Sequence, residues 1–139
     1  FASSLGANHL INYKKYPNWS DKVKEITNGE GVNLTLELGG KNTFLQSIKA
    51  TKFSGTIALI GVLGGGIVEL PLGLAITKLL KINAVACGSK KDLQNLLNFI
   101  KINKIKPIID KVFNFEELIF AMNYMDKGKH LGKIILKNT

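Results

Sequence analysis

The hydrophobic residues of the chain follow two spacings. Apolar residues three and four positions apart predict helices that begin near Asn18, Phe44, Ser89 and Asn114. The first of these helices is predicted to place Trp19, Val23 and Ile26 on one face. Strand-like runs predict strands at residues 9–12, 33–38, 56–60, 83–87, 108–113 and 133–136, and residues 57–60 are continuously apolar. Such runs are typical of parallel strands covered on both faces, so the alternation of strand and helix predicts an α/β fold with a parallel sheet.

Polar residues at the predicted helix starts indicate how the helices are capped. Ser89 and Asp92 have the spacing of a capping box in which the acid is Asp, and Asn114 and Glu117 have the same spacing. Asn18 is predicted to cap the first helix through its side chain.

Three of the predicted strands end in glycine. Gly39 and Gly40 follow residues 33–38, Gly61 follows residues 56–60, and Gly88 follows residues 83–87. The carboxyl ends of parallel strands meet at one edge of a sheet, where open α/β folds bind ligands. Glycine has no Cβ, so its backbone can approach a flat ligand closely. Glycine also simply ends strands, but three such ends together favour a ligand site.

Glu37 is the one carboxylate in an unusual position, because it lies inside a predicted strand just before the glycines. We expect it to order the following loop by accepting hydrogen bonds from backbone N–H groups, rather than to act directly in catalysis. The sequence contains no G-x-G-x-x-G fingerprint, no Walker A motif and no Ser/His/Asp or Cys/His arrangement with plausible spacing.

The net charge of +9 comes from 19 lysines and no arginine, and these lysines are spread from Lys14 to Lys137. Proteins that read nucleic acids concentrate basic charge on one face and use arginine for bidentate contacts. A basic nucleic-acid-binding domain is therefore a disfavoured alternative.

Other features of the composition narrow the class of protein. The longest apolar run, residues 57–68, is shorter than the roughly 20 residues needed to cross a bilayer. A single cysteine, Cys87, excludes an internal disulfide and favours a reducing compartment, so we expect a cytoplasmic protein. Cys87, His9 and His130 lie too far apart in sequence to indicate a zinc site. The first residue is Phe1, and we expect the chain to be part of a longer protein.

Six sequence blocks occur in a fixed order: LGANHLINY, TNGEGVNLTLELGG, FSGTIALIGVLGGG, CGSKKDLQNLLNFI, KPIIDKVFNFEELIFAM and GKHLGKIIL. Together they resemble the C-terminal part of the medium-chain dehydrogenase/reductase superfamily, in particular bacterial NAD(P)-dependent alcohol dehydrogenases and quinone oxidoreductase-like proteins. The resemblance covers essentially the whole chain. It implies that residues 1–105 form the second part of a doubly wound NAD(P)-binding Rossmann domain, strands 3 to 6. Residues 106–139 would be a returning segment of the catalytic domain.

The resemblance also implies cofactor-binding roles for eight residues. Tyr13 would lie near the adenosine ribose or its 2′-phosphate. The loops past the adenosine and nicotinamide riboses would contain Gly39, Gly61, Val62 and Leu63. Gly88 and Ser89 would face the nicotinamide carboxamide, and Lys133 would approach the cofactor phosphates. Three alternatives stay open: Tyr13 as an ordinary surface aromatic residue, Ser89 as a helix cap, and Lys133 as a solvated lysine.

The implied activity is hydride transfer between a nicotinamide cofactor and an alcohol/carbonyl or enone/quinone substrate. Lys14 and Lys15, beside Tyr13, slightly favour NADP over NAD. Catalytic groups, and zinc in zinc-dependent relatives, would come from outside this chain. The resemblance further implies a homodimer through edge pairing of residues 82–87. A non-catalytic nucleotide-binding module and an inactive gene remnant are the alternatives.

The Rossmann strand order has one consequence for a chain of this extent. In the order 3-2-1-4-5-6, the third strand does not touch the fourth. The segment around Leu10 and Ile11 therefore lacks its only neighbour in the sheet, and we expect the chain to be weakly stable by itself.

Overall fold

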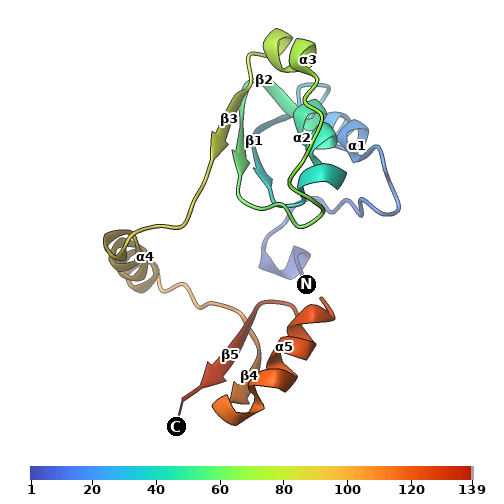
Figure 1. Cartoon of the computed structure of the whole chain (residues 1–139). Helices are drawn as coiled ribbons and strands as arrows, with labels where there is room; N and C mark the ends of the chain where they lie inside the picture. The colour runs from blue at the N-terminus through green and yellow to red at the C-terminus, as the bar shows by residue number, and fades with distance from the viewer. Residues whose placement is uncertain (139) are drawn as a thin grey trace. The chain divides into compact units, whose positions relative to one another are not determined.

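The computed structural model describes residues 1–138 and separates into two compact units, Phe1–Cys87 and Gly88–Thr139, with Thr139 outside the described residues (Figure 1). The first unit contains η1 (Ser3–Leu5), α1 (Trp19–Ile26), β1 (Val32–Glu37), η2 (Gly40–Asn42), α2 (Phe44–Ala50), β2 (Thr51–Leu59), α3 (Leu72–Thr77) and β3 (Lys81–Ala84). The second unit contains α4 (Lys90–Ile102), β4 (Ile109–Asn114), η3 (Phe115–Glu117), α5 (Leu118–Asp126) and β5 (Lys133–Lys137).

Both units contain parallel strands. In the first unit the strand order is β1-β2-β3, and Ile57 of β2 is in register with Thr35 of β1 and Ile82 of β3. In the second unit β4 pairs in parallel with β5, and α5 packs against both strands. The predicted α/β class with parallel sheets is confirmed.

The core of the first unit lies between α2 and the sheet. Helix α2 packs on β1 and β2, and α1 packs on α2 on the same side of the sheet (Figure 1). Ile48 of α2 and Ile57 of β2 are fully buried, and Phe44 packs with them. Burial of a side chain of this size contributes about 1.5–3 kcal/mol, so these residues anchor the helix on the sheet.

The opposite face of this sheet is exposed, and the part of it that β1 forms is apolar. Successive side chains of a strand point to opposite faces, so Leu34 and Leu36 of β1 point away from α2 and are 54% and 59% exposed. Leu38 and Ile60, beyond the strand ends, are also exposed. This composition is typical of a parallel sheet covered on both faces, although no helix of Phe1–Cys87 covers it.

The prediction of a strand at residues 9–12 is wrong. These residues have no regular secondary structure, so the sheet of the first unit has three of the four Rossmann strands that were predicted. Asn12 instead begins a turn, in which its side-chain oxygen accepts hydrogen bonds from the N–H groups of Lys14 and Lys15 at 3.0 and 3.2 Å. The physical reason is the one given by the strand order: this segment has no neighbouring strand to accept its backbone hydrogen bonds.

The helix starts only partly follow the sequence. Both capping boxes are present, at Ser89–Asp92 and at Asn114–Glu117. The predicted side-chain cap by Asn18 is absent. Gln46, from α2, accepts a hydrogen bond from the N–H group of Ser20 at 3.1 Å and takes over part of this role. A residue far away in sequence thus ties the start of α1 to α2.

The carbonyl end of α2 is capped by a lysine from another part of the chain. The Lys78 ammonium group donates hydrogen bonds to the carbonyl oxygens of Ile48 and Lys49, at 2.8 and 2.9 Å. The last carbonyls of a helix have no partner within the helix, and a cation there is favoured by the helix dipole. Burial lowers the pKa of Lys78, and repulsion from Lys24 lowers it further.

Replacement of this cation should destabilise the first unit. We expect Lys78→Met to lower the free energy of unfolding by about 1–2 kcal/mol, because two helix carbonyls lose a charged donor. Urea unfolding followed by the fluorescence of Trp19, the only tryptophan, provides the measurement. The control is Lys22→Met, which removes an exposed pair with Glu25 and a contact with the Tyr16 ring at 6.0 Å, and should leave the urea midpoint nearly unchanged. Equal midpoints for the two variants would contradict the capping role.

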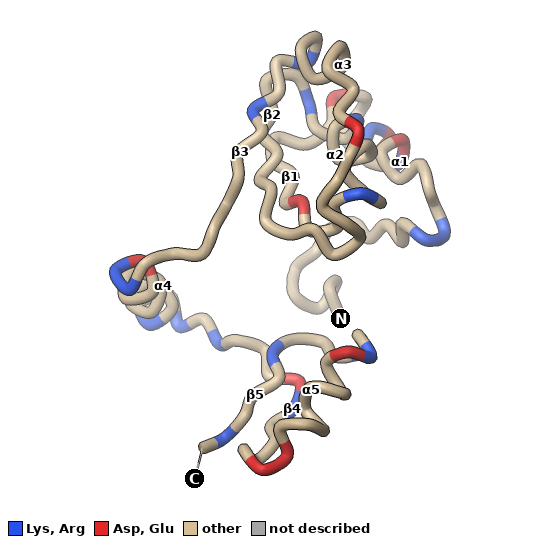
Figure 2. Tube along the Cα trace, in the orientation of Figure 1, with Lys and Arg blue, Asp and Glu red and all other residues tan. Residues whose placement is uncertain are grey.

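Lysines occur along the backbone of both units, and they outnumber the acidic residues in the sequence by 19 to 10 (Figure 2). Within residues 1–138, no helix has both the length and the apolar character needed to cross a membrane.

Candidate functional site

Two loops meet at the carboxyl edge of the first sheet. Residues 38–43, the first edge loop, follow β1, and residues 60–66, the second edge loop, follow β2. Three backbone hydrogen bonds join them: Leu63 N–H to Leu38 O (3.0 Å), Gly64 N–H to Gly39 O (2.6 Å) and Lys41 N–H to Gly65 O (3.0 Å). The pairing of β1 with β2 thus continues beyond the strands into the loops.

The glycines in these loops allow the two backbones to approach each other. Gly40 has a φ of +70°, and a Cβ on it would lie 2.3 Å from the carbonyl oxygen of Gly65. A Cβ on Gly61 would lie 3.0 Å from the carbonyl oxygen of Leu38. These contacts give the two glycines a role beside the one predicted from the sequence, in which the missing Cβ atoms leave room for a ligand. Gly66, in contrast, faces open space.

Glu37, the last residue of β1, binds the first edge loop through its carboxylate. Its carboxylate is only 2% exposed and accepts hydrogen bonds from the N–H groups of Gly39 (2.8 Å) and Gly40 (2.9 Å). The hydroxyl groups of Thr43 and Ser47 also donate to it, Thr43 to the same oxygen as the two N–H groups and Ser47 to the other. The prediction that Glu37 orders this loop is confirmed.

The environment of Glu37 keeps it ionised. Burial raises the pKa of its carboxyl group, but the hydrogen bonds from Ser47, Thr43, Gly40 and Gly39 lower it, and the net result is a pKa below the ordinary value of 4.5. The ionised carboxylate accepts four hydrogen bonds at neutral pH. It is therefore a structural anion and is poorly suited to exchange protons with a substrate.

A pocket of about 570 Å³ lies beside the first edge loop. Tyr13, Gly39 and Leu63, three of the residues predicted to bind a cofactor, line it together with Trp19 and Asn42. Tyr13 reaches this position from the turn that Asn12 stabilises. The fold therefore brings one aromatic side chain from residues 1–18 to the carboxyl edge of the sheet.

Trp19 is a pocket residue that the sequence analysis missed. The spacing of apolar residues assigned it to the buried face of a helix, but it is half-buried and lines the same pocket as Tyr13. One signal was available, since Trp19 is the only tryptophan and is the first residue of its helix.

A second, smaller pocket of about 210 Å³ lies next to the second edge loop. Gly61 and Val62, two further predicted site residues, line it with Phe44 and Leu59. Glu37 borders both this pocket and the one that contains Tyr13. Five of the eight predicted residues therefore gather at one edge of one sheet.

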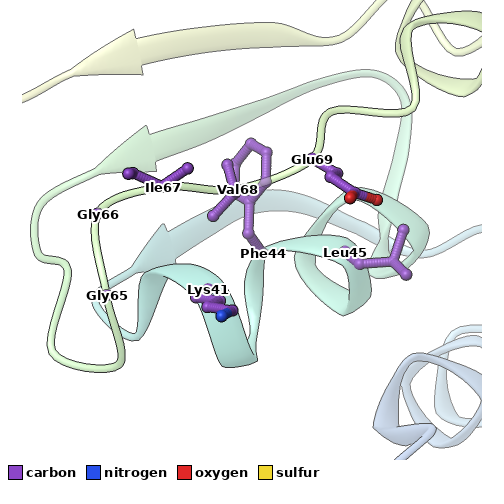
Figure 3. Close-up of a pocket in the computed structure, with 8 residues that line it drawn as sticks. All are labelled: Lys41, Phe44, Leu45, Gly65, Gly66, Ile67, Val68 and Glu69. Carbon is purple, nitrogen blue, oxygen red and sulfur yellow. The ribbon is translucent and has the colours of Figure 1, made fainter.

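Another pocket, of about 650 Å³, contains none of the predicted site residues. In Figure 3, the segment from Gly65 to Glu69 runs past the start of α2, where Phe44 and Leu45 lie. Lys41 and Glu69 are its only charged residues.

The remaining predicted site residues belong to the second unit. Gly88 and Ser89 line a pocket at the start of α4. Ser89 caps that helix: its side chain accepts a hydrogen bond from the N–H group of Asp92 at 3.3 Å, which confirms the capping interpretation. Lys133 is exposed at the start of β5, and its N–H group donates to Ile108 at 2.8 Å. A cofactor role for these three residues stays a prediction.

No group of three or more His, Cys, Asp or Glu side chains in residues 1–138 is arranged to hold a metal ion. The described residues do not fit a zinc site.

Comparisons with known proteins agree with this geometry. The family model of the zinc-binding dehydrogenases matches residues 1–101. A zinc-type alcohol dehydrogenase-like protein of Schizosaccharomyces pombe is 36% identical over 141 residues, which cover 99% of this chain and 41% of that protein. An NAD-dependent alcohol dehydrogenase of Sulfolobus acidocaldarius is 30% identical over 141 residues, which cover 99% of this chain and 39% of the relative.

A solved structure shows the same fold. A Sinorhizobium meliloti protein classed as an alcohol dehydrogenase superposes with a TM-score of 0.89 at 32% identity, over 98% of this chain and 39% of that protein. The chain spans about two-fifths of the length of the relatives that it matches. By sequence and by fold, it belongs to the zinc-binding dehydrogenases of the medium-chain dehydrogenase/reductase superfamily, as the resemblance to zinc-type alcohol dehydrogenases and quinone oxidoreductase-like proteins implied.

Proposed function

We propose that this chain supplies part of the nucleotide site of an NAD(P)-dependent oxidoreductase. The enzyme would transfer a hydride between the nicotinamide and an alcohol/carbonyl or enone/quinone substrate. The main support is the pocket lined by Tyr13, Trp19, Gly39 and Leu63, at the carboxyl edge of a parallel sheet. Nucleotides bind at this edge in open α/β folds. The relative from Sulfolobus acidocaldarius, named as NAD-dependent, supports the choice of cofactor.

The pocket fits the adenosine part of the cofactor. Its volume of about 570 Å³ lies in the range of small-molecule sites. Tyr13 and Trp19 offer aromatic faces to a purine, and the Asn42 side chain offers both a donor and an acceptor. The pocket with Gly61 and Val62 would then take the nicotinamide ribose. Gly88 and Ser89 would face the carboxamide, and Lys133 would approach the phosphates.

The cofactor supplies the hydride chemistry, and the protein orients the rings and excludes water. In this proposal the residues of the chain bind and position the nucleotide, while the groups that polarise the substrate, and zinc if it is used, come from outside the chain. Residues 1–105 belong to the nucleotide-binding domain and residues 106–139 to the catalytic domain.

Three further features are part of the proposal. Lys14 and Lys15 follow Tyr13 in the turn after residue 12, and their charges slightly favour NADP over NAD. Strand β3 is at one end of the sheet order, so its free edge is available for pairing with a second copy in a homodimer. The place of action is the cytoplasm.

Nucleotide binding can be measured directly, because the single tryptophan lies in the pocket. We expect NADH to quench Trp19 by energy transfer. We expect Tyr13→Ala to weaken binding about 5- to 10-fold through the loss of one stacking surface. Tyr16→Ala is the matched control: Tyr16 lies three residues away and does not line the pocket, so its loss should change the Kd less than about twofold.

Two outcomes would count against the proposed site: no quenching of the unmodified chain at millimolar NADH, or equal losses in the two tyrosine variants. A repeat of the titration with NADPH tests the preference for the 2′-phosphate. A non-catalytic nucleotide-binding module would pass these tests as well. It is distinguished by the absence of NAD(P)H-dependent reduction of aldehydes and quinones in a longer protein that contains this chain.

A further inference from the structure

We propose that Glu37 is a positioning residue that holds both edge loops as one unit, so that nucleotide affinity depends on how this buried carboxylate orders the two loops. This inference rests on the proposed function, because it concerns the same site. It goes beyond the ordering of a single loop, since it links Glu37 to residues on the neighbouring loop.

Glu37 contacts the first edge loop directly. One carboxylate oxygen accepts hydrogen bonds from three donors, the N–H groups of Gly39 and Gly40 and the hydroxyl group of Thr43. These donors lie at the turn between β1 and α2, where the backbone reverses direction. With Glu37 2% exposed, no water can replace the carboxylate without a rearrangement of the loop. Loss of the acceptor would leave buried donors without partners.

Backbone hydrogen bonds connect the first edge loop to the second. Gly39 accepts a hydrogen bond from Gly64 at 2.6 Å, and Leu38 accepts one from Leu63 at 3.0 Å. The Lys41 N–H group, on the residue after Gly40, donates to Gly65 at 3.0 Å. Glu37 therefore fixes the N–H groups of Gly39 and Gly40, and the backbone of Gly39 and of the next residue after Gly40, Lys41, binds the second edge loop.

The two edge loops form two walls of the pocket that contains Tyr13. Gly39 belongs to the first edge loop and Leu63 to the second, and both line the pocket with Tyr13. The relative position of these two walls is set by the hydrogen bonds described above. A loop pair that is ordered before binding lowers the entropic cost of association. Removal of Glu37 should thus separate the two walls of the pocket, although Gly39 and Leu63 themselves are unchanged.

Amide hydrogen exchange of the 139-residue chain tests this link independently of any ligand. Glu37→Met removes the acceptor at similar size, Glu37→Gln keeps one acceptor oxygen, and Ser47→Ala removes only the donor to the other oxygen. A stabilising osmolyte keeps the folded state populated in all variants. In Glu37→Met we expect the amides of Leu63 and Gly64 to exchange at least about tenfold faster relative to those of β2. In Glu37→Gln and Ser47→Ala this ratio should stay within about threefold of the unmodified chain.

A proportional increase in the exchange of β2 and loop amides in Glu37→Met would overturn the inference, because it would show a general loss of stability only. The inference would also be overturned if the amides of Gly39 and Gly40 exchanged faster in Glu37→Met while those of Leu63 and Gly64 did not.

NADH titration, followed through Trp19, gives a second readout. We expect the Kd, corrected for the folded fraction, to rise at least about tenfold in Glu37→Met and less than about threefold in Glu37→Gln and Ser47→Ala. Unchanged affinity in Glu37→Met would overturn the inference. If the unmodified chain did not bind NADH, the proposed function would fail, and the exchange ratios would still decide whether Glu37 links the two loops.

Discussion

Gly40→Ala is expected to lower the free energy of unfolding of the first unit by roughly 2–4 kcal/mol. Gly40 has a φ of +70°, which L-amino acids rarely adopt, and an added Cβ would lie 2.3 Å from the carbonyl oxygen of Gly65. The backbone strain and the clash add together. Relief of the clash requires the two edge loops to separate, which breaks the hydrogen bond from Lys41 to Gly65. Urea unfolding followed by Trp19 fluorescence measures this change.

Gly66→Ala is the matched control for Gly40→Ala. Gly66 lies in the second edge loop, its φ is not positive, and a Cβ on it would meet nothing within 4 Å. We expect a change of less than about 0.5 kcal/mol, or a slight gain from the smaller entropy of the unfolded chain. If Gly40→Ala and Gly66→Ala unfolded at the same urea concentration, the close approach of the two loops would be wrong.

Glu37→Gln is expected to make the free energy of unfolding fall less between neutral and acidic pH than it does in the unmodified chain. The pKa of Glu37 is lower in the folded chain than its ordinary value of 4.5. The ionised carboxylate therefore stabilises the fold above pH 4.5, and this contribution is lost as the pH falls from there through the lower pKa of the folded state. Glutamine cannot ionise and makes only neutral hydrogen bonds. We expect it to be less stable by about 1.5–3 kcal/mol at neutral pH and to approach the unmodified chain in acid.

The measurement compares the urea midpoint at about pH 7 with the midpoints at progressively lower pH, through the titration of Glu37. The control is Glu25→Gln, which changes an exposed carboxylate paired only with Lys22. This control should show the same pH dependence as the unmodified chain. A difference between Glu37→Gln and the unmodified chain that stayed constant with pH would contradict the role of the ionised carboxylate.

Local sequence patterns predicted much of the fold. The α/β class, the parallel strands and both capping boxes depend on residues close together in the chain, and all are present. Glu37 was recognised as a loop-ordering residue because two of its donors, Gly39 and Gly40, lie only two and three residues away. Such short-range contacts leave a signature in the spacing of residue types.

Contacts between distant segments were not predicted. Gln46 caps α1 from 26 residues away, and Lys78 caps α2 from 30 residues away. The segment at 9–12 has strand-like composition but no strand neighbour, so it forms a turn instead. Composition describes what a segment favours, whereas a strand also needs a partner for its backbone hydrogen bonds.

The amino-acid sequence alone was enough to predict the family, the order of helices and strands from residue 18 onward, and the edge at which the candidate site lies. These properties follow from periodicity and from motifs in a fixed order. The tertiary structure decided which side chains surround the pocket, added Trp19 to it, and showed that Gly40 and Gly61 serve the approach of one loop to another. The reason is physical: the packing of two loops depends on distances between atoms of residues far apart in sequence, and no local pattern records those distances.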